Sequence, residues 1–540
     1  MLAAPPRGNP TLTDSRPDAA TELRELLISS LLPDLRWPEF SAYRPQITEF
    51  YSASDYSLAW TRDSLPTVAA GAIIEALITA DWKGLDPEDY DGPRWSSRLR
   101  GLQKSGASAR DLARFDLALT ISAMRYISDI TAGKVNPKSV HPDFRTTRNH
   151  YDPASVLREC LLNALDARGV LESVEPPFDG YRRTQKALQS YLGLARRANS
   201  EPLPPRTEPL KPGGTYSGIK RLTELLRLLG DLPHDAVVSG EMQVYQSPLV
   251  EAVKRFQIRH GLDPDGRIDA RTLHELNTPL TRRVRQLQLT LERWRWVPHD
   301  FPRPPIVVNI PEFRLRGLNN AYLTELDMKV VVGKAYRHRT PVFAAELKHV
   351  IFRPYWNVPL SIVRSEILPA LQRTGSSEAY RDFQIVTPDG TVTREHAVSD
   401  RTLSLLRNGK WRIRQLPGPE NALGLVKFIF PNDNDVYLHD TPAQHLFSKM
   451  RRDFSHGCIR VERPQALAEW VLRNNPEWTS ERIAAAMNGA GTVQVDVNPA
   501  IPVLIVYATA VVLQGGEVRF FDDIYGLDAA LDKQLNRTHP

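Results

Sequence analysis

Two short stretches in the last quarter of the chain hold residue types that could perform nucleophilic catalysis. They are Asp435-Val-Tyr-Leu-His439 and Phe454-Ser-His-Gly-Cys458. Cysteine attacks as its thiolate, and histidine is the side chain best suited to remove the thiol proton near neutral pH. Gly457 would let backbone N–H groups approach a developing oxyanion. These residues predict acyl transfer through a thioester on Cys458, with His439 as base.

Apolar and polar side chains alternate before the histidine. Val436 and Leu438 would point to one face of a strand, and Tyr437 and His439 to the other, because successive strand residues face opposite sides. We therefore expect His439 at a strand end, facing away from its apolar neighbours. Cys458 would follow in a glycine-containing loop.

The residue types alone leave other interpretations open. His439 could end a strand, His456 could bond its own loop, and Cys458 could be inert, since such residues are common in structural roles. Zinc bound by His439, His456 and Cys458 is a weaker alternative. Zinc usually takes four ligands, or three and a water, and no Cys-x-x-Cys or His-Glu-x-x-His spacing is present.

Composition narrows the class of protein. The net charge of +6 is spread over 540 residues, and no run of Lys and Arg is interleaved with aromatic residues, so nothing indicates nucleic-acid binding. Cys160 lies in a stretch with helical apolar spacing and reads as a small buried side chain. A disulfide between Cys160 and Cys458 stays open at this point.

The pattern along the chain predicts an α+β multidomain protein. Helical periodicity dominates up to about residue 300, and short β-type runs with Pro and Gly turns follow. We expect a flexible tail at 1–20, a helical scaffold domain at 21–212, a three-helix unit at 213–278, a connecting helix at 279–304, a β-rich catalytic domain at 305–530 with an insertion at 360–416, and a tail at 531–540.

Individual elements are expected within these domains. Helices are predicted at 67–80, 111–130, 219–229, 250–260, 270–276, 281–296 and 361–373. Strands are predicted at 306–310, 328–332, 349–352, 425–430, 435–439, 492–497 and 502–509.

The spacing of the two histidines and the cysteine resembles a known family signature. His439, fifteen intervening residues and Ser455-His-Gly-Cys-Ile-Arg460 are similar to the motif of the YkuD-type L,D-transpeptidase family. That motif commonly ends in Asn where this chain has Arg460, a departure familiar in the family's large YcbB-like branch. Further stretches resemble the same branch: Tyr355–Pro359, Arg414–Gly424, Asp522–Gly526 and Gly84–Tyr90.

The resemblance implies a reaction. Cys458 would attack the carbonyl of the third residue of a peptidoglycan tetrapeptide stem, D-alanine would leave, and an amine of a second stem would form a 3→3 cross-link. His439 would move the proton, and the backbone at Asp440 would orient its imidazole. Ser455 and His456 would organise the loop. The family uses no metal or cofactor, and carbapenems inhibit it covalently; the resemblance assigns no role to Arg460.

The resemblance also extends to the other parts of the chain. Residues 213–278 are similar to a peptidoglycan-binding domain that would contact glycan, and 360–416 correspond to a capping subdomain that would exclude water from the thioester. An L,D-carboxypeptidase or endopeptidase with the same Cys458 and His439 is one alternative. A catalytically silent wall-binding protein is another.

The implied reaction takes place in the periplasm or cell envelope. Residues 1–10 do not form a recognisable secretory signal, because no charged segment precedes an apolar one. The longest apolar run, at 501–513, is shorter than the roughly 20 residues of a membrane span and reads as a strand. Localisation in the cell envelope is therefore expected from the resemblance alone.

Overall fold

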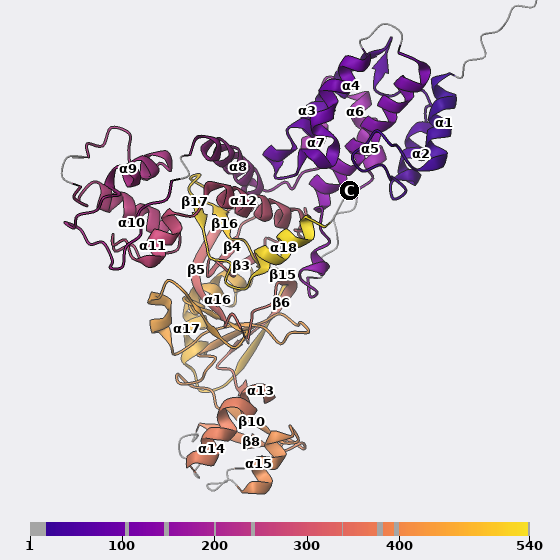
Figure 1. Ribbon diagram of the computed structural model, residues 1–540. Coiled ribbons are helices and arrows are strands. Elements are labelled where there is room, and N and C mark those ends of the chain that lie inside the picture. Colours follow the sequence, from indigo (N-terminus) through magenta and orange to yellow (C-terminus); the bar gives the residue numbers. More distant parts are fainter. Residues whose placement is uncertain are drawn as a thin grey trace, which may run out of the picture.

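The computed structural model describes residues 18–102, 107–144, 151–198, 201–238, 243–336, 338–374, 382–393 and 399–537. A helical bundle, a smaller three-helix unit, a sheet domain and a subdomain projecting from it are the main parts (Figure 1). This mixture confirms the expected α+β multidomain class. In Figure 1 the bundle and the projecting subdomain lie at opposite ends of the molecule.

The N-terminal bundle packs around one long helix. Its elements are α1 (Ala19–Ser29), α2 (Arg44–Ser52), β1 (Thr61–Arg62), β2 (Leu65–Pro66), α3 (Val68–Ile78), α4 (Trp95–Leu102), α5 (Ala109–Ala132), α6 (Pro153–Leu162) and α7 (Ala167–Ser173). Helix α5 begins with a capping box between Ser108 and Asp111. Its Asp116 is fully buried and accepts the backbone N–H groups of Ala59 and Trp60. The carboxylate therefore ties the β1 region to the middle of the bundle.

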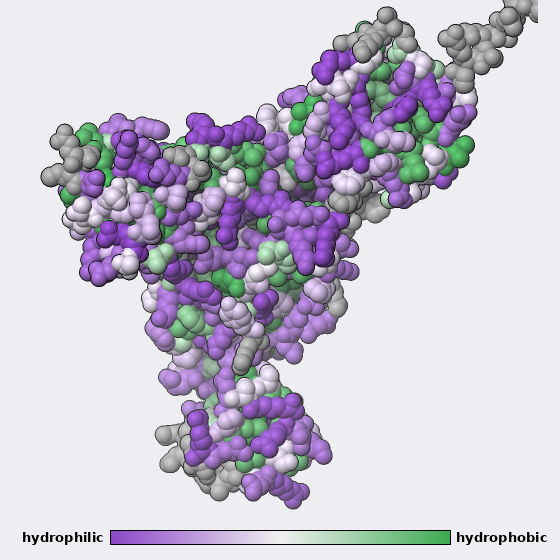
Figure 2. Space-filling view, in the orientation of Figure 1, coloured by the Kyte–Doolittle hydropathy of each residue, from purple (hydrophilic) through white to green (hydrophobic). Residues whose placement is uncertain are grey.

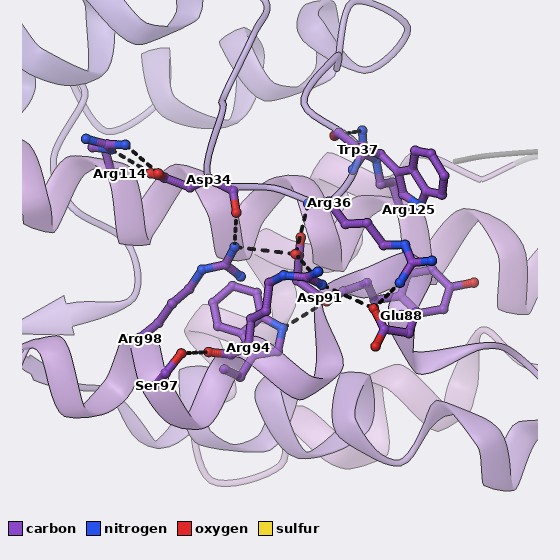
Figure 3. A network of polar contacts seen from close by, with 12 residues as sticks. Asp34, Arg36, Trp37, Glu88, Asp91, Arg94, Ser97, Arg98, Arg114 and Arg125 are labelled. Carbon is purple, nitrogen blue, oxygen red and sulfur yellow. Dashed lines mark hydrogen bonds and ion pairs between the residues drawn. The ribbon is translucent and has the colours of Figure 1, made fainter.

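A network of arginines and carboxylates joins loops at one side of the bundle (Figure 3). Asp91 accepts the backbone N–H of Arg36 at 3.0 Å and forms an ion pair with Arg98 at 3.5 Å. Arg98 also donates to the carbonyl of Asp34, whose carboxylate pairs with Arg114 of α5. These contacts fasten the loop after α1 to α5, which is a structural role.

Helix α8 (Asp179–Arg197) lies in the range expected for the scaffold domain but packs elsewhere. Its buried Leu188 belongs to a core shared with Leu287 of α12 (Leu280–Arg295) and with Phe520. The apolar face of the strongly amphipathic α8 thus packs against α12 beside the sheet domain, rather than against the bundle of α1 to α7. Figure 1 shows α8 and α12 between the bundle and the three-helix unit.

The three-helix unit follows the predicted pattern closely. It contains α9 (Ile219–Leu228), α10 (Leu249–Arg259) and α11 (Ala270–Leu276). Apolar residues at helical spacing, among them Leu222, Val253 and Phe256, form its core. The predicted helices at 219–229, 250–260 and 270–276 are confirmed within a residue or two.

A closed sheet forms the centre of the catalytic domain. In the described residues its order is β13-β5-β14-β12-β11-β6-β15-β3-β4, and β4 also pairs with β5, which closes the ring. The strands are β3 (Ile306–Asn309), β4 (Arg314–Leu318), β5 (Thr324–Gly333), β6 (Phe343–Phe352), β11 (Val426–Ile429), β12 (Leu438–His439), β13 (Asp453–Ser455), β14 (Ile459–Val461) and β15 (Val493–Val506). Helices α16 (Pro464–Leu472) and α17 (Ser480–Asn488) and a hairpin of β16 (Ala510–Val512) and β17 (Val518–Phe520) complete the domain.

Two expected strands form one. The runs at 492–497 and 502–509 both belong to β15, which pairs with β6 along its length. The register shifts between Asp496 and Ile501, so the residues between them are an irregularity within one strand. Pairing with β6 on both sides of the irregularity joins the two expected strands into one.

The insertion has a hydrophobic core of its own. Its elements are β7 (Trp356–Asn357), α13 (Leu360–Ile362), a π-helical turn (Val363–Ile367), α14 (Leu368–Thr374), β8 (Phe383–Val386), β9 (Val392–Thr393), α15 (Asp400–Arg407) and β10 (Arg412–Gln415). Val363, Leu406 and Ile413 are buried in it, and Trp411 packs against it. We call this unit the lid subdomain.

The expected boundaries at both ends need correction. Helix α1 begins at Ala19, inside the range expected for an N-terminal tail, and the earlier part of that range lies outside the described residues. At the other end, α18 (Leu527–Leu535) crosses the expected boundary at 530. Its Leu531 is 0% exposed in the catalytic core, so residues up to 535 are not a tail.

The surface of the visible face is mostly hydrophilic (Figure 2). Polar side chains cover much of the sheet domain and the lid subdomain in this view. Within the described parts of the chain, no helix combines the length and the apolar character that crossing a bilayer requires.

Replacing Leu531 by alanine is expected to lower the free energy of unfolding by roughly 2–4 kcal/mol, because it leaves a cavity in the catalytic core. Urea denaturation measures this change. Lys533→Ala, at an exposed position of the same helix, is the matched control and should cost less than about 0.5 kcal/mol. Equal midpoints for Leu531→Ala and wild type would contradict the docking of α18.

Candidate active site

Two neighbouring parallel strands bring the expected nucleophile and base onto one face of the sheet. In β12 and β14, Leu438 lies opposite Ile459 and His439 lies opposite Arg460. Leu438 and Ile459 are both 0% exposed in the core. Because side chains alternate, His439 and Cys458 belong to the opposite face, as the alternation in the sequence predicted.

The imidazole of His439 is buried and held in one tautomer. Its Nδ1 donates to the carbonyl oxygen of Asp440 at 2.6 Å, so Nδ1 carries the proton and Nε2 keeps its lone pair. Burial lowers the pKa of His439 to about 3, and the positive charges of Arg460 and Lys427 act in the same direction. The side chain is therefore neutral at physiological pH, which is the form that a base requires.

The turn after β12 is fixed by the carboxylate of Asp440. One of its oxygens accepts the N–H of Leu425 at 2.8 Å, and the other accepts the N–H of Thr441 at 2.7 Å. A Cβ added at Gly424 would lie 2.3 Å from this carboxylate, so only glycine fits there. The backbone carbonyl of Asp440 thus accepts a hydrogen bond from His439, and the Asp440 side chain holds the turn that carries this carbonyl.

Cys458 is half-buried, and neither it nor Cys160 forms a disulfide. Its sulfur lies 3.5 Å from the carbonyl oxygen of Asp435 and accepts hydrogen bonds from the hydroxyl and backbone N–H of Tyr437. Burial raises the pKa of the Cys458 thiol, while the Tyr437 hydrogen bonds and the charge of Lys427 oppose this rise. Donors are thus already in place for a thiolate.

The loop before Cys458 is braced by Ser455. The Ser455 hydroxyl donates to the carbonyl of Cys458 at 2.5 Å and accepts the N–H of Gly457 at 3.2 Å. Gly457 has φ +118°, which favours glycine, and its carbonyl accepts the hydroxyl of Thr340. The Gly457 N–H is therefore engaged and not available to an oxyanion. Among the described residues the N–H of Cys458 has no acceptor and is the better candidate donor.

The side chain of His456 contacts the lid subdomain. Its Nε2 lies 2.6 Å from a carboxylate oxygen of Glu366 in the lid subdomain, and its ring lies 4.7 Å from that of His338. His456 is thus part of a contact between loop and lid. In the part of the chain that the structure describes, no three His, Cys, Asp or Glu side chains form a group that could hold a metal ion.

Arg460 and two residues that sequence reasoning missed complete this face. Arg460 is half-buried, and its Nε is enclosed without a hydrogen-bond acceptor among the described residues. Tyr437 bonds Cys458, and the base of the lid reaches it through a hydrogen bond from Trp356. Lys427 of β11 lies over the Tyr437 ring. The sequence indicated Tyr437 only through the strand alternation that places it on the same face as His439. Lys427 is distant in sequence, and no local pattern indicated it.

This arrangement is suited to covalent acyl chemistry. A cysteine sulfur with hydrogen-bond donors around it lies on the same sheet face as a neutral imidazole, and the adjoining N–H of Cys458 finds no acceptor in the residues that the structure describes. These are the parts that a thiol-dependent acyl transferase needs: nucleophile, proton acceptor and oxyanion donor.

Comparisons with known proteins identify the domains. Residues 303–497 match the model of the L,D-transpeptidase catalytic domain, 45–188 match a scaffold domain, and 215–276 match a domain described as "Putative peptidoglycan binding domain". A Haemophilus influenzae protein named "Putative L,D-transpeptidase" is 31% identical over 253 residues, which are 47% of this chain and 49% of that protein. The chain therefore spans about half the length of this curated relative.

A solved structure is also similar, at a lower level. It is the L,D-transpeptidase (residues 123–326) of Xylanimonas cellulosilytica, with 15% identity, 56% of this chain and all of that chain covered, and a TM-score of 0.18. The matched residues include most of the sheet, the lid subdomain and the Cys458 loop. The chain thus contains an L,D-transpeptidase catalytic domain at residues 303–497.

The neutral state of His439 predicts how stability depends on pH. The unfolded imidazole binds a proton below about pH 6.5 and the folded one only near pH 3, so the folded state loses stability as pH falls through this window. We expect the loss between pH 7 and 4.5, measured by urea denaturation, to be roughly 2 kcal/mol smaller in His439→Gln than in wild type. His445→Gln, at an exposed histidine, is the matched control. Parallel losses in wild type and His439→Gln would contradict the buried neutral state.

Proposed function

We propose that this protein is an L,D-transpeptidase that forms 3→3 cross-links in peptidoglycan through a thioester on Cys458. The observation that supports the proposal is the thiol of Cys458 held by Tyr437 on the same sheet face as the neutral, Nδ1-protonated His439. The match to a peptidoglycan-binding domain at 215–276 supports the substrate class. Its site of action would then be the periplasm or cell envelope.

In the first half-reaction the thiol proton passes to Nε2 of His439. The sulfur attacks the carbonyl of the third stem residue, and the N–H of Cys458 donates to the oxyanion. The bond to D-alanine breaks, and its amine takes the proton from His439. The products are free D-alanine and a thioester between the stem and Cys458.

In the second half-reaction an amine of another stem attacks the thioester. His439 accepts a proton from this amine, the new amide bond forms, and the carbon–sulfur bond breaks. The sulfur leaves as a thiolate that Tyr437 receives with its hydroxyl and N–H. The proton then returns from His439 to sulfur, so the enzyme is regenerated.

The lid subdomain would favour an amine over water as acceptor. Glu366 pairs with His456 two residues from the nucleophile, and Trp356 bonds Tyr437. Both contacts place the base of the lid against the reacting side of the sheet. A lid held there shields the thioester from solvent until a second stem enters. A carboxypeptidase with the same Cys458 and His439 would instead admit water.

A carbapenem should acylate Cys458. We expect intact-mass measurement to show one adduct on the wild-type protein and none on Cys458→Ala. Cys160→Ala is the matched control and should keep the adduct, because Cys160 is 0% exposed and burial raises its pKa to about 12. A folded wild-type protein without adduct, or an adduct that persists in Cys458→Ala, would contradict the assignment of the nucleophile.

The products formed from tetrapeptide muropeptides separate the candidate functions. A transpeptidase gives D-alanine and 3→3 dimers, whereas a carboxypeptidase gives D-alanine and tripeptides; a silent wall-binding protein gives neither. We expect dimers, detected by mass spectrometry, to be the main product of the wild-type protein.

Weakening the lid contact should shift this product ratio. Glu366→Gln removes the carboxylate from a partly exposed contact worth roughly 0.5–1 kcal/mol, so the ratio of tripeptide to dimer should rise about twofold to fivefold. Glu420→Gln, an exposed glutamate beyond β10, is the control and should leave the ratio unchanged. An unchanged ratio in Glu366→Gln would mean that this contact does not govern access of water.

A further inference from the structure

Three basic side chains form a row across three neighbouring strands at the active site. Lys427 of β11 lies opposite His439 of β12, and His439 lies opposite Arg460 of β14. Residues that are opposite each other in adjacent strands share a face. The row therefore lies on the face that carries Cys458, although Lys427 is more than thirty residues from it in sequence.

Lys427 is placed unlike a surface lysine. Its side chain is half-buried, and among the described residues it forms neither an ion pair nor a hydrogen bond. Its ammonium lies 3.8 Å from the centre of the Tyr437 ring. Burial lowers the pKa of Lys427, and the negative charge that acts on it most strongly is the Cys458 thiolate, followed by Asp435. A desolvated cation without a carboxylate partner is costly unless an anion forms nearby.

Tyr437 links this cation to the nucleophile. The ammonium lies over the face of the ring, where a cation is attracted by the negative face of the π-system. The hydroxyl of the same ring donates to the sulfur of Cys458. Lys427 therefore contacts Tyr437, and Tyr437 contacts Cys458. The positive charge of Lys427 acts on the sulfur and also holds in place the tyrosine hydroxyl that bonds the sulfur.

We propose that Lys427 is a positioning residue of this active site, whose ammonium holds Tyr437 against Cys458 and supplies the positive charge that stabilises the Cys458 thiolate. The proposal rests on the proposed function, because it assigns a role in forming the nucleophile of that reaction. It explains why a half-buried lysine occupies the active-site face of β11, where an apolar side chain would pack without desolvating a charge.

Charged or titratable groups on β12, on β14 and on the turn before β12 also act on this site. Asp435, from the turn before β12, is negative and acts against the thiolate. Arg460, two residues along β14, is positive and interacts with it favourably. His439 is neutral until it accepts the thiol proton. Lys427 is the positive charge from a separate strand, and its removal is therefore expected to shift the balance toward the thiol.

The test measures the pH dependence of alkylation of Cys458 by iodoacetamide in the full-length protein, with the modified peptide identified by mass. Only the thiolate reacts, so the midpoint of the rate profile reports the pKa of Cys458. In Lys427→Met, which keeps a long apolar stem over Tyr437, the midpoint should rise by about half a pH unit or more, and the rate near neutral pH should fall about threefold or more. The plateau rate at high pH should be unchanged.

Two variants serve as controls. Lys348→Met removes the same charge from an exposed position in β6 and should leave the midpoint where it is in wild type. Lys427→Arg keeps a positive charge, so its midpoint should lie close to that of wild type. If Lys427→Met does not fold, as judged by circular dichroism, Lys427→Gln is measured in the same way.

A midpoint in folded Lys427→Met or Lys427→Gln equal to that of wild type would overturn the proposal. A rate that falls equally at all pH values would also overturn it, because that outcome indicates a structural role alone. Alkylation involves no peptidoglycan or acceptor amine. Failure to form cross-links would therefore refute the proposed function while leaving this measurement interpretable, and the reverse also holds.

Discussion

The parallel pairing of β12 with β14 is the constraint on which the active site depends. The N–H of Ile459 donates to the carbonyl of Tyr437 at 3.0 Å, and this bond fixes which side chains share a face. Burial of Leu438 and Ile459 sets the register, because a slip of one residue would turn these apolar side chains outward and Cys458 inward. The same core packing that stabilises the sheet therefore also brings sulfur, phenol and imidazole together.

Segments distant in sequence also hold the pairing of β12 with β14 in place. β5 pairs antiparallel with β14 and, through its last two residues, parallel with β13, so both ends of the nucleophile loop are attached to one strand. The hydroxyl of Tyr525 donates to the carbonyl of Gly333 at the end of β5, and Thr340 bonds Gly457. The C-terminal segment thus braces the loop, which gives a physical reason for α18 to be docked rather than free.

Local sequence patterns predicted part of this architecture but not all of it. Period-two alternation placed His439 on the correct face, and helical spacing predicted the helices at 219–276 closely. The partner of α8, the joining of two runs into β15 and the closure of the ring depend on contacts between distant segments, which leave no local signal. Lys427 illustrates this limit best, since its spacing along β11 is that of any strand residue and only pairing with β12 brings it to the site.

The resting site contains no strong ion pair between its nucleophile and its base. Burial keeps His439 neutral and favours the thiol form of Cys458, so the proton must move when substrate arrives. That ordering has an advantage, because a thiolate that forms only with a carbonyl in place is protected from oxidation and unproductive attack. In the proposed reaction, Tyr437, Lys427 and Arg460 stabilise the sulfur when it loses its proton and again when it leaves the acyl group. The N–H of Cys458, which has no acceptor within the described part of the chain, is available for the oxyanion between these two events.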